Sequence, residues 1–163
     1  MIVIADTSPL NYLIQIDCIH LLPRLYGKIL VPAGVLRELS NAGAPAAVQT
    51  WAMQTPPWIE IGSTVFPIDI TLAFLGLGER EAIQLAQESH ADLILIDERK
   101  GSLEVQRRGL RTTGTLGVLL ASAEFGLLDA RQAYMRLIER TTFRTSPALE
   151  AAFLAQVQAT SGF

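Results

Sequence analysis

Short apolar runs alternate with amphipathic segments along the whole chain. Ile2 to Ala5 is entirely apolar, and Leu93 to Ile96 is a second run of the same kind. Such short, branched apolar runs are typical of strands that are buried on both faces of a parallel sheet. The pattern predicts three further strands, at 28–31, at the sheet edge over 58–61, and at 110–113.

The segments between these runs carry apolar residues at the three- and four-residue spacing of a helix. Hydroxyl residues followed by proline mark two helix starts, at Thr7-Ser8-Pro9 and at Ser146-Pro147. Segment 62–74 has no period and is predicted to be a loop. We expect helices that start at 7 and at 32, and others over about 19–26, 45–54, 79–89, 99–108, 115–125, 130–140 and 147–158.

Strands that alternate with helices over short connections predict an α/β fold, namely a three-layer α/β/α sandwich with a mainly parallel central sheet. The length of 163 residues fits a single domain over 1–163, in which about 129–163 forms a C-terminal helical extension.

Composition narrows the class of protein. The net charge of −3 argues against nucleic-acid binding through bulk positive charge, although bound metal ions supply such charge locally. Cys18 is the single cysteine, so the chain has no intramolecular disulfide and no cysteine zinc cage, which fits a reducing, cytoplasmic setting. No apolar run approaches the ~20 residues that span a bilayer, and the first residues predict a strand rather than a signal peptide.

Asp6 and Asp97 each follow a buried apolar run. Ligands of open α/β sheets bind outside the carboxyl ends of the strands, so two acids there favour a shared site. The alternative is that each acid caps the next helix. Glu38 lies inside a predicted helix, where the alternative is a solvated side chain.

Glu79 and Glu81 open the predicted helix after Gly78, where acids also favour the helix dipole. Two residues correspond to about 200° around a helix, so at most one of these acids points into a shared site. Gly76 and Gly78 are not followed by the lysine of a phosphate loop, which excludes that motif.

Clustered carboxylates repel one another and raise each other's proton affinity. A bound divalent cation offsets this repulsion. Mg²⁺ takes oxygen ligands and usually keeps several waters, and a bound cation activates water against a phosphodiester. His20 and His90 are predicted to be structural or solvated, and no serine–histidine triad motif is present. The basic residues after Asp97 either form a solvated helix face or hold phosphates: Arg99, Lys100, Arg107, Arg108 and Arg111.

Three segments together resemble the PIN-domain nucleases, the superfamily that includes VapC-type toxins of toxin–antitoxin pairs. They are Ile-Ala-Asp-Thr-Ser-Pro-Leu (4–10), Val-Pro-x-x-Val-x-x-Glu-Leu (31–39) and Ala-Asp-Leu-Ile-Leu-Ile-Asp (91–97). The sequence is most similar to a VapC-like subgroup marked by Leu-Gly-x-Gly-Glu-x-Glu-Ala-Ile (75–83) and Gly-Thr-Leu-Gly-Val-Leu (114–119).

The resemblance implies a ribonuclease that depends on Mg²⁺ or Mn²⁺ and cleaves single-stranded RNA. Asp6, Glu38, Glu79 and Asp97 match its acidic quartet, with Glu81 as the fallback for Glu79 and with Thr7 or Ser8 supporting the first acid. Three features depart from the family pattern. The third acid is Glu rather than Asp, and Gly101-Ser102 stands where related chains tend to have Gly-Arg. The chain also carries two extra C-terminal helices, for which the resemblance implies no function beyond packing or dimer contacts.

The resemblance also implies a homodimer and an antitoxin partner, with no membrane association. Arg99 and Lys100 are the candidates for phosphate contacts. Two alternatives remain. One is a PIN-like module that binds a partner with little or no catalysis. The other is a receiver-like phosphotransfer domain, which is disfavoured because no lysine follows Lys100.

Overall fold

The computed structural model describes residues 1–161 and contains a five-stranded parallel sheet of order β3-β2-β1-β4-β5. Ile4, at the middle of the central strand, pairs with Leu30 on one side and with Ile94 on the other. The predicted α/β/α sandwich with a parallel sheet is confirmed. The strands are β1 (Val3–Ala5), β2 (Ile29–Pro32), β3 (Ile59–Gly62), β4 (Leu93–Leu95) and β5 (Thr112–Thr113).

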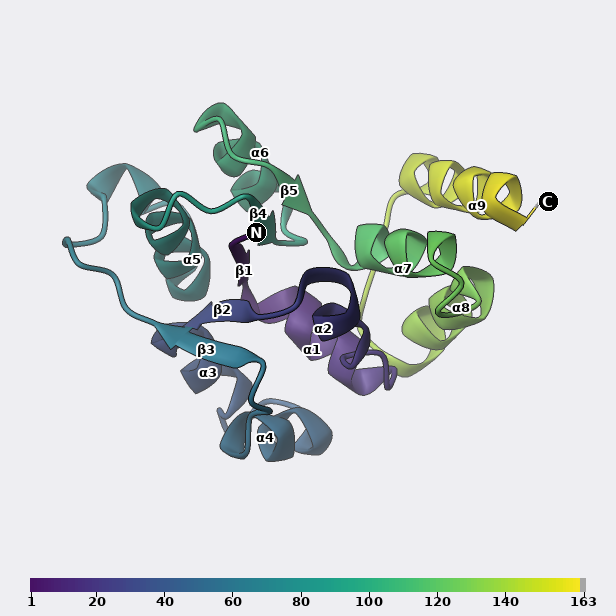
Figure 1. The fold of residues 1–163 in the computed structure, drawn as a ribbon, viewed down its shortest axis with the longest axis horizontal. Helices are drawn as coiled ribbons and strands as arrows, with labels where there is room; N and C mark the ends of the chain where they lie inside the picture. The colour runs from purple at the N-terminus through teal and green to yellow at the C-terminus, as the bar shows by residue number, and fades with distance from the viewer. Residues whose placement is uncertain (162–163) are drawn as a thin grey trace.

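Helices cover both faces of this sheet. Figure 1 shows α5 and α6 on one side of the strands and α1, α2 and α7 on the other. The helices are α1 (Thr7–Gln15), α2 (Leu21–Tyr26), α3 (Ala33–Leu39), α4 (Ala46–Met53), α5 (Leu77–Glu88), α6 (Arg99–Arg107), α7 (Thr115–Glu124), α8 (Ala130–Arg140) and α9 (Pro147–Ser161).

Alternate residues of the central strands enter two separate cores. Val3 and Ala5 contribute to the core beneath α1, α2 and α7, whereas Ile4 contributes to the core beneath α5 and α6. Successive side chains of a strand point to opposite faces, so a strand buried on both sides must be apolar throughout. This requirement explains why the strands are visible in the sequence as continuous apolar runs.

The chain order creates a crevice between β1 and β4. From β1 the sheet grows through β2 to β3 on one side, and the chain then returns to add β4 and β5 on the other. The connections that leave β1 and β4 therefore run in opposite directions, which opens a crevice at their carboxyl ends. Asp6 and Asp97 follow these two strands.

Segment 62–74, which was predicted to be a loop, contains one short 3₁₀ helix, η1 (Ile70–Leu72). The Asp69 side chain caps it by accepting a hydrogen bond from the Thr71 backbone amide. A three-residue turn is too short to produce a hydrophobic period, so the sequence pattern does not reveal it. Within residues 1–161, no helix combines the length and apolar character that crossing a membrane requires.

Candidate active site

Asp6 is a buried carboxylate with one oxygen unpartnered in the described part of the chain. It occupies the position before α1, but its side chain makes no capping hydrogen bond, so the capping interpretation does not account for it. The side chain is 2% exposed, and Oδ1 has no hydrogen-bond partner among the described residues. Burial raises the pKa of Asp6 to about 7. A hydrogen bond from the Thr7 backbone opposes that rise, and the charges of Glu79, Glu38 and Asp97 add to it.

Asp97 is held by the start of α7. The Thr115 backbone amide donates to Oδ1 and the Thr115 hydroxyl donates to Oδ2, each at 2.7 Å. Burial raises the pKa of Asp97, and these two hydrogen bonds oppose the rise. The cap of α6 is Glu98, whose side chain accepts from the Gly101 amide. Asp97 therefore does not cap α6, the helix that follows it, but it binds the first backbone amide of α7.

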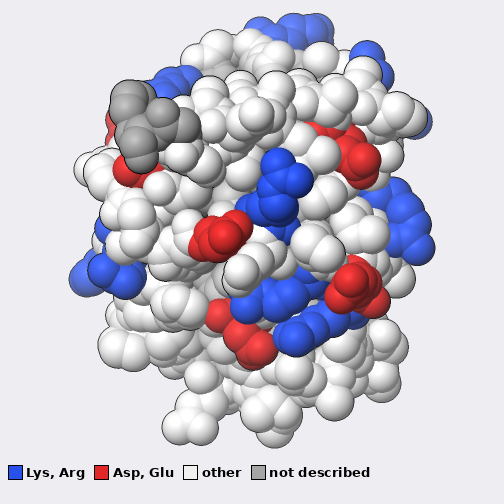
Figure 2. Space-filling model, turned by 90° about the vertical axis from the view of Figure 1, so that its right-hand side faces the viewer, with Lys and Arg blue, Asp and Glu red and all other residues white. Residues whose placement is uncertain are grey.

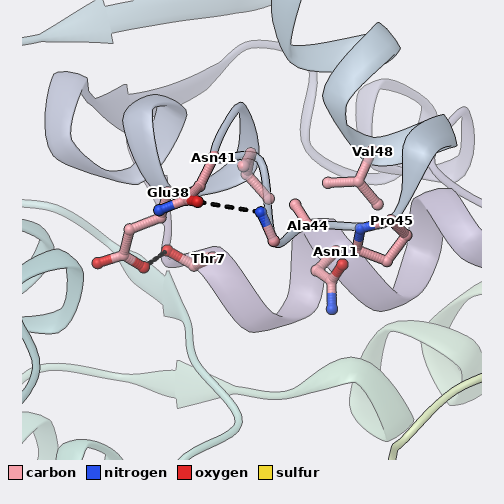
Figure 3. A pocket seen from close by; sticks show the side chains of 9 residues that line it. Thr7, Asn11, Glu38, Asn41, Ala44, Pro45 and Val48 are labelled. Carbon is pink, nitrogen blue, oxygen red and sulfur yellow. Dashed lines mark hydrogen bonds between the residues drawn. The ribbon is translucent and has the colours of Figure 1, made fainter.

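Glu38 is exposed, but it links three elements. The Thr7 hydroxyl donates to Oε2 at 2.6 Å, and the Gly78 backbone amide donates to Oε1 at 3.0 Å. Figure 3 shows the side chains of Thr7 and Glu38 pointing toward one another. Thr7 begins α1 and Gly78 lies in the first turn of α5, so these bonds fix the Glu38 carboxylate at the starts of both helices. Glu38 is thus exposed, as the solvated alternative expects, but it is also hydrogen-bonded to two other helices.

Glu79 and Glu81 point in different directions, as their spacing predicts. Glu81 accepts a hydrogen bond from the Gly34 amide at 2.9 Å and forms a 3.5 Å ion pair with Arg37, both on α3. Glu79 instead lies close enough to Asp6 to raise its pKa. Its own pKa is raised by burial and by the charges of Glu98 and Glu38, against a hydrogen bond with the Gly76 backbone. The geometry thus favours Glu79 over Glu81 as the third acid.

The remaining candidates lie farther out. Ser8 is half-buried at the start of α1, whereas His20 and His90 are exposed. Arg99 and Lys100 are exposed on the first turn of α6. Sequence reasoning missed Glu98 and Thr115. The position of Glu98 next to Asp97 was a usable signal, but nothing in the sequence ties Thr115 to Asp97 across 18 residues.

Two hollows flank the acids. One, of about 440 Å³, has Thr7, Asn11 and Glu38 in its wall (Figure 3). The other, of about 510 Å³, includes Ser8 and Asp97. The neighbouring residues Thr7 and Ser8 therefore face different hollows, with Glu38 in the wall of the first and Asp97 in the wall of the second.

The donor set fits a hard divalent cation, although the acids do not already converge as ligands. Among residues 1–161, no three His, Cys, Asp or Glu side chains form a ready-made metal cage. Mg²⁺ does not require one, because it usually binds one or two carboxylates and retains waters. Asp6 Oδ1, buried and unpartnered, is the atom whose environment most requires a cation.

Comparison with known proteins identifies the family. The family model DUF3368, described as a PIN domain, matches residues 2–159. The chain belongs to the PIN-domain family. No curated protein and no solved structure matches it.

PIN domains are generally nucleases and bind nucleic acid, so membership in the family points to a nuclease-type function. The four carboxylates described above lie within the matched residues. The narrower VapC-like assignment, the RNA substrate and the toxin role stay predictions.

Proposed function

We propose that this PIN domain is a divalent-metal-dependent endoribonuclease that cleaves single-stranded RNA. The observation that carries the proposal is the buried Asp6 carboxylate, whose Oδ1 has no hydrogen-bond partner among residues 1–161 while three other carboxylates add to the rise of its pKa. Such a cluster is unfavourable unless it serves to bind a positive charge. The order of motifs along the chain supports this interpretation.

Asp6, Glu38, Glu79 and Asp97 are the residues proposed to hold Mg²⁺ or Mn²⁺, either directly or through water. A bound cation supplies Lewis-acid stabilisation of the phosphate and a water of lowered pKa. Thr115 orients both oxygens of Asp97, and Thr7 with the Gly78 amide orients Glu38. The protein's contribution is therefore the fixed placement of oxygen donors beyond the carboxyl ends of the central strands.

The test is cleavage of a mixed-sequence RNA with Mn²⁺ by wild type, by Asp6→Asn and by a control, Glu60→Gln. Glu60 is an exposed acid on β3 and lines neither hollow beside the quartet. We expect cleavage by wild type and control, and a loss of at least 100-fold in Asp6→Asn. Equal rates in wild type and Asp6→Asn, or no cleavage by wild type across varied RNAs, would refute the proposal.

A partner-binding module with little catalysis is the second candidate. The engagement of Glu38 by two hydrogen bonds and the lack of a ready-made cage among residues 1–161 favour it. Calorimetric titration with Mn²⁺ separates the two candidates. Saturable binding that Asp6→Asn abolishes supports the nuclease, and absence of binding supports the module.

The toxin role, with an antitoxin partner and a homodimer in the cytoplasm, is a further part of the proposal. It rests on the resemblance of residues 75–83 and 114–119 to the VapC-like subgroup. We expect induced expression of wild type in a bacterial host to arrest growth and expression of Asp6→Asn to be tolerated. Light scattering on the purified chain tests the dimer.

A further inference from the structure

The 510 Å³ hollow beside Asp97 has walls from distant parts of the chain. Ser8 comes from α1, Ser102 from α6, Thr112 from β5, and Arg144 from the connection between α8 and α9. Its volume is in the range of pockets that hold small organic ligands. The segment that closes its outer side belongs to the C-terminal extension, for which the resemblance suggests no role.

Arg144 brings a positive charge to this wall. Its Nη1 donates to the Phe143 carbonyl at 2.7 Å, which leaves other guanidinium N–H groups for a ligand. It forms no ion pair with any residue of 1–161. Asp97 and Glu98 also line the hollow, but neither pairs with Arg144, so its guanidinium is available to a ligand that brings its own negative charge.

The positive charge of this hollow comes from the C-terminal segment and not from α6. The α6 residues in the lining are Ser102 and Gln106, which are polar and uncharged. Arg144 is the one lysine or arginine among the described lining residues.

The rest of the lining suits a nucleotide rather than a bare anion. Thr112 Oγ1 is buried without a hydrogen-bond partner among the described residues, and Gln106 adds an amide. Tyr12, Leu116 and Leu149 supply apolar surface for a base or a sugar. Figure 2 shows blue and red side chains intermixed near the centre of the face on the side of α7–α9, with uncharged surface around them. A local nucleotide contact fits this surface better than a long electrostatic track.

We infer that Arg144 binds a backbone phosphate of single-stranded RNA and holds the adjoining nucleotide in the hollow lined by Ser102 and Thr112. The inference rests on the proposed function and deepens it by assigning a substrate-positioning role to the C-terminal extension. Phosphate contacts position the RNA, and the Ser102 hydroxyl and the Gln106 amide in the lining are the groups available to hydrogen-bond the nucleotide.

The test is direct binding of a fluorescent mixed-sequence RNA 12-mer, measured by anisotropy in EDTA and at several salt concentrations. We compare wild type, Arg144→Ala, Arg144→Lys and the control Arg131→Ala. Arg131 is exposed on α8 and lines neither hollow beside the acids. We expect Arg144→Ala to weaken binding about tenfold and to lower the salt slope by about 0.7. Arg144→Lys should recover part of the affinity, and Arg131→Ala should bind as wild type does.

A rescue experiment separates positioning from a merely structural role. Adding Ser102→Arg to Arg144→Ala places a cation on the α6 side of the same hollow, and we expect it to restore most of the affinity. In cleavage assays, Arg144→Ala should raise KM more than it lowers kcat. Circular dichroism and thermal unfolding verify that each variant is folded.

The outcomes distinguish the inference from the proposed function. If wild type cleaves RNA through Asp6 while Arg144→Ala and Arg131→Ala bind RNA equally well, the inference is wrong and the nuclease stands. If wild type binds no RNA, the inference is overturned. If wild type binds RNA through Arg144 but never cleaves it, the inference stands as a binding site and the nuclease proposal fails.

Discussion

The environment of Asp6 sets the chemistry of the site at the residue scale. A carboxylate that is 2% exposed loses most of its hydration, and its Oδ1 gains no hydrogen bond from residues 1–161 in return. Its pKa accordingly rises from 3.8 to about 7. The metal-free protein therefore binds a proton at neutral pH that the unfolded chain has already released.

This difference makes stability depend on pH. The group's protonated form is favoured by folding, so stability is highest below the unfolded pKa and falls as pH rises toward 7. Asp6→Asn removes this titration. In EDTA, we expect wild type to lose roughly 2–3 kcal/mol of unfolding free energy between pH 5 and pH 8 that Asp6→Asn does not lose. The stability of the variant relative to wild type should therefore rise by that amount. Urea unfolding at both pH values measures it, and a difference independent of pH would contradict the burial argument.

The second residue-scale prediction concerns the support of Asp97. Thr115→Val keeps the side-chain shape but removes the hydroxyl that donates to Oδ2 at 2.7 Å. A hydrogen bond to a charged group contributes about 1.5–3 kcal/mol, so we expect a stability loss of that order above neutral pH together with slower RNA cleavage. Thr115→Ser retains the donor and serves as the control. Equal stability of the two variants at pH 8 would show that the bond does not hold Asp97.

The sequence reveals only part of the site at this scale. Asp6 and Asp97 are visible because each follows an apolar run that is short enough to be a buried strand. Glu38 and Glu79 depended on the family resemblance, since each has an adequate structural explanation of its own. Arg144 was not predicted, because its place beside Asp97 results from the packing of the C-terminal segment and has no local signal.

At the scale of elements, the site depends on the close approach of α3 and α5. A Cβ at Gly34 on α3 would overlap the Glu81 carboxylate of α5, and a Cβ at Gly78 would lie 2.8 Å from Glu38 Oε1. Glu81 of α5 accepts a hydrogen bond from the Gly34 amide of α3, and Glu38 of α3 accepts one from the Gly78 amide of α5. The missing side chains of Gly34 and Gly78 make these two bonds sterically possible.

Gly34→Ala tests this contact. Alanine is the better helix former, so propensity alone predicts stabilisation. Because the new methyl group displaces Glu81, we expect instead a loss of about 1–3 kcal/mol and reduced cleavage. The control is Gly43→Ala, where the nearest atom to a Cβ is 3.8 Å away. A stabilised Gly34→Ala, measured by chemical denaturation, would show that the helices can separate without cost.

Most elements were predictable because their signals are local. Buried strands and amphipathic helices carry their burial pattern in their own residues. The two helix starts marked by proline, those of α1 and α9, lie within one residue of their predicted positions. The turn η1 was missed because three residues show no period. Its capping by Asp69 was the remaining signal.

At the scale of the whole molecule, the C-terminal helices join the main core. Phe153 and Val157 of α9 are buried in the cluster that contains Val3 and Leu95 from the sheet. The Tyr134 hydroxyl of α8 donates to the Glu150 carboxylate of α9, which ties the two helices together. The hollow next to Asp97 therefore depends on how this extension packs.

This packing predicts that residues 1–163 unfold as one domain. Phe153→Ala should lower stability by about 3–5 kcal/mol and shift the whole transition rather than detach α9 alone. Trp51 and Trp58 lie in α4 and just before β3, so tryptophan fluorescence reports on a part of the molecule other than α9. If the chain unfolds as one domain, this fluorescence and far-ultraviolet circular dichroism should give the same midpoint. Two separate transitions would mean that the extension folds independently.

The measurement that most directly tests the central claim is calorimetric titration of Mn²⁺ into wild type, Asp6→Asn, Asp97→Asn and Glu60→Gln. If folding gathers these carboxylates to hold a cation, wild type and Glu60→Gln bind Mn²⁺ saturably, and both Asp variants lose at least tenfold in affinity. Wild type that binds no Mn²⁺, or Asp variants that bind it as tightly as wild type does, would contradict the account.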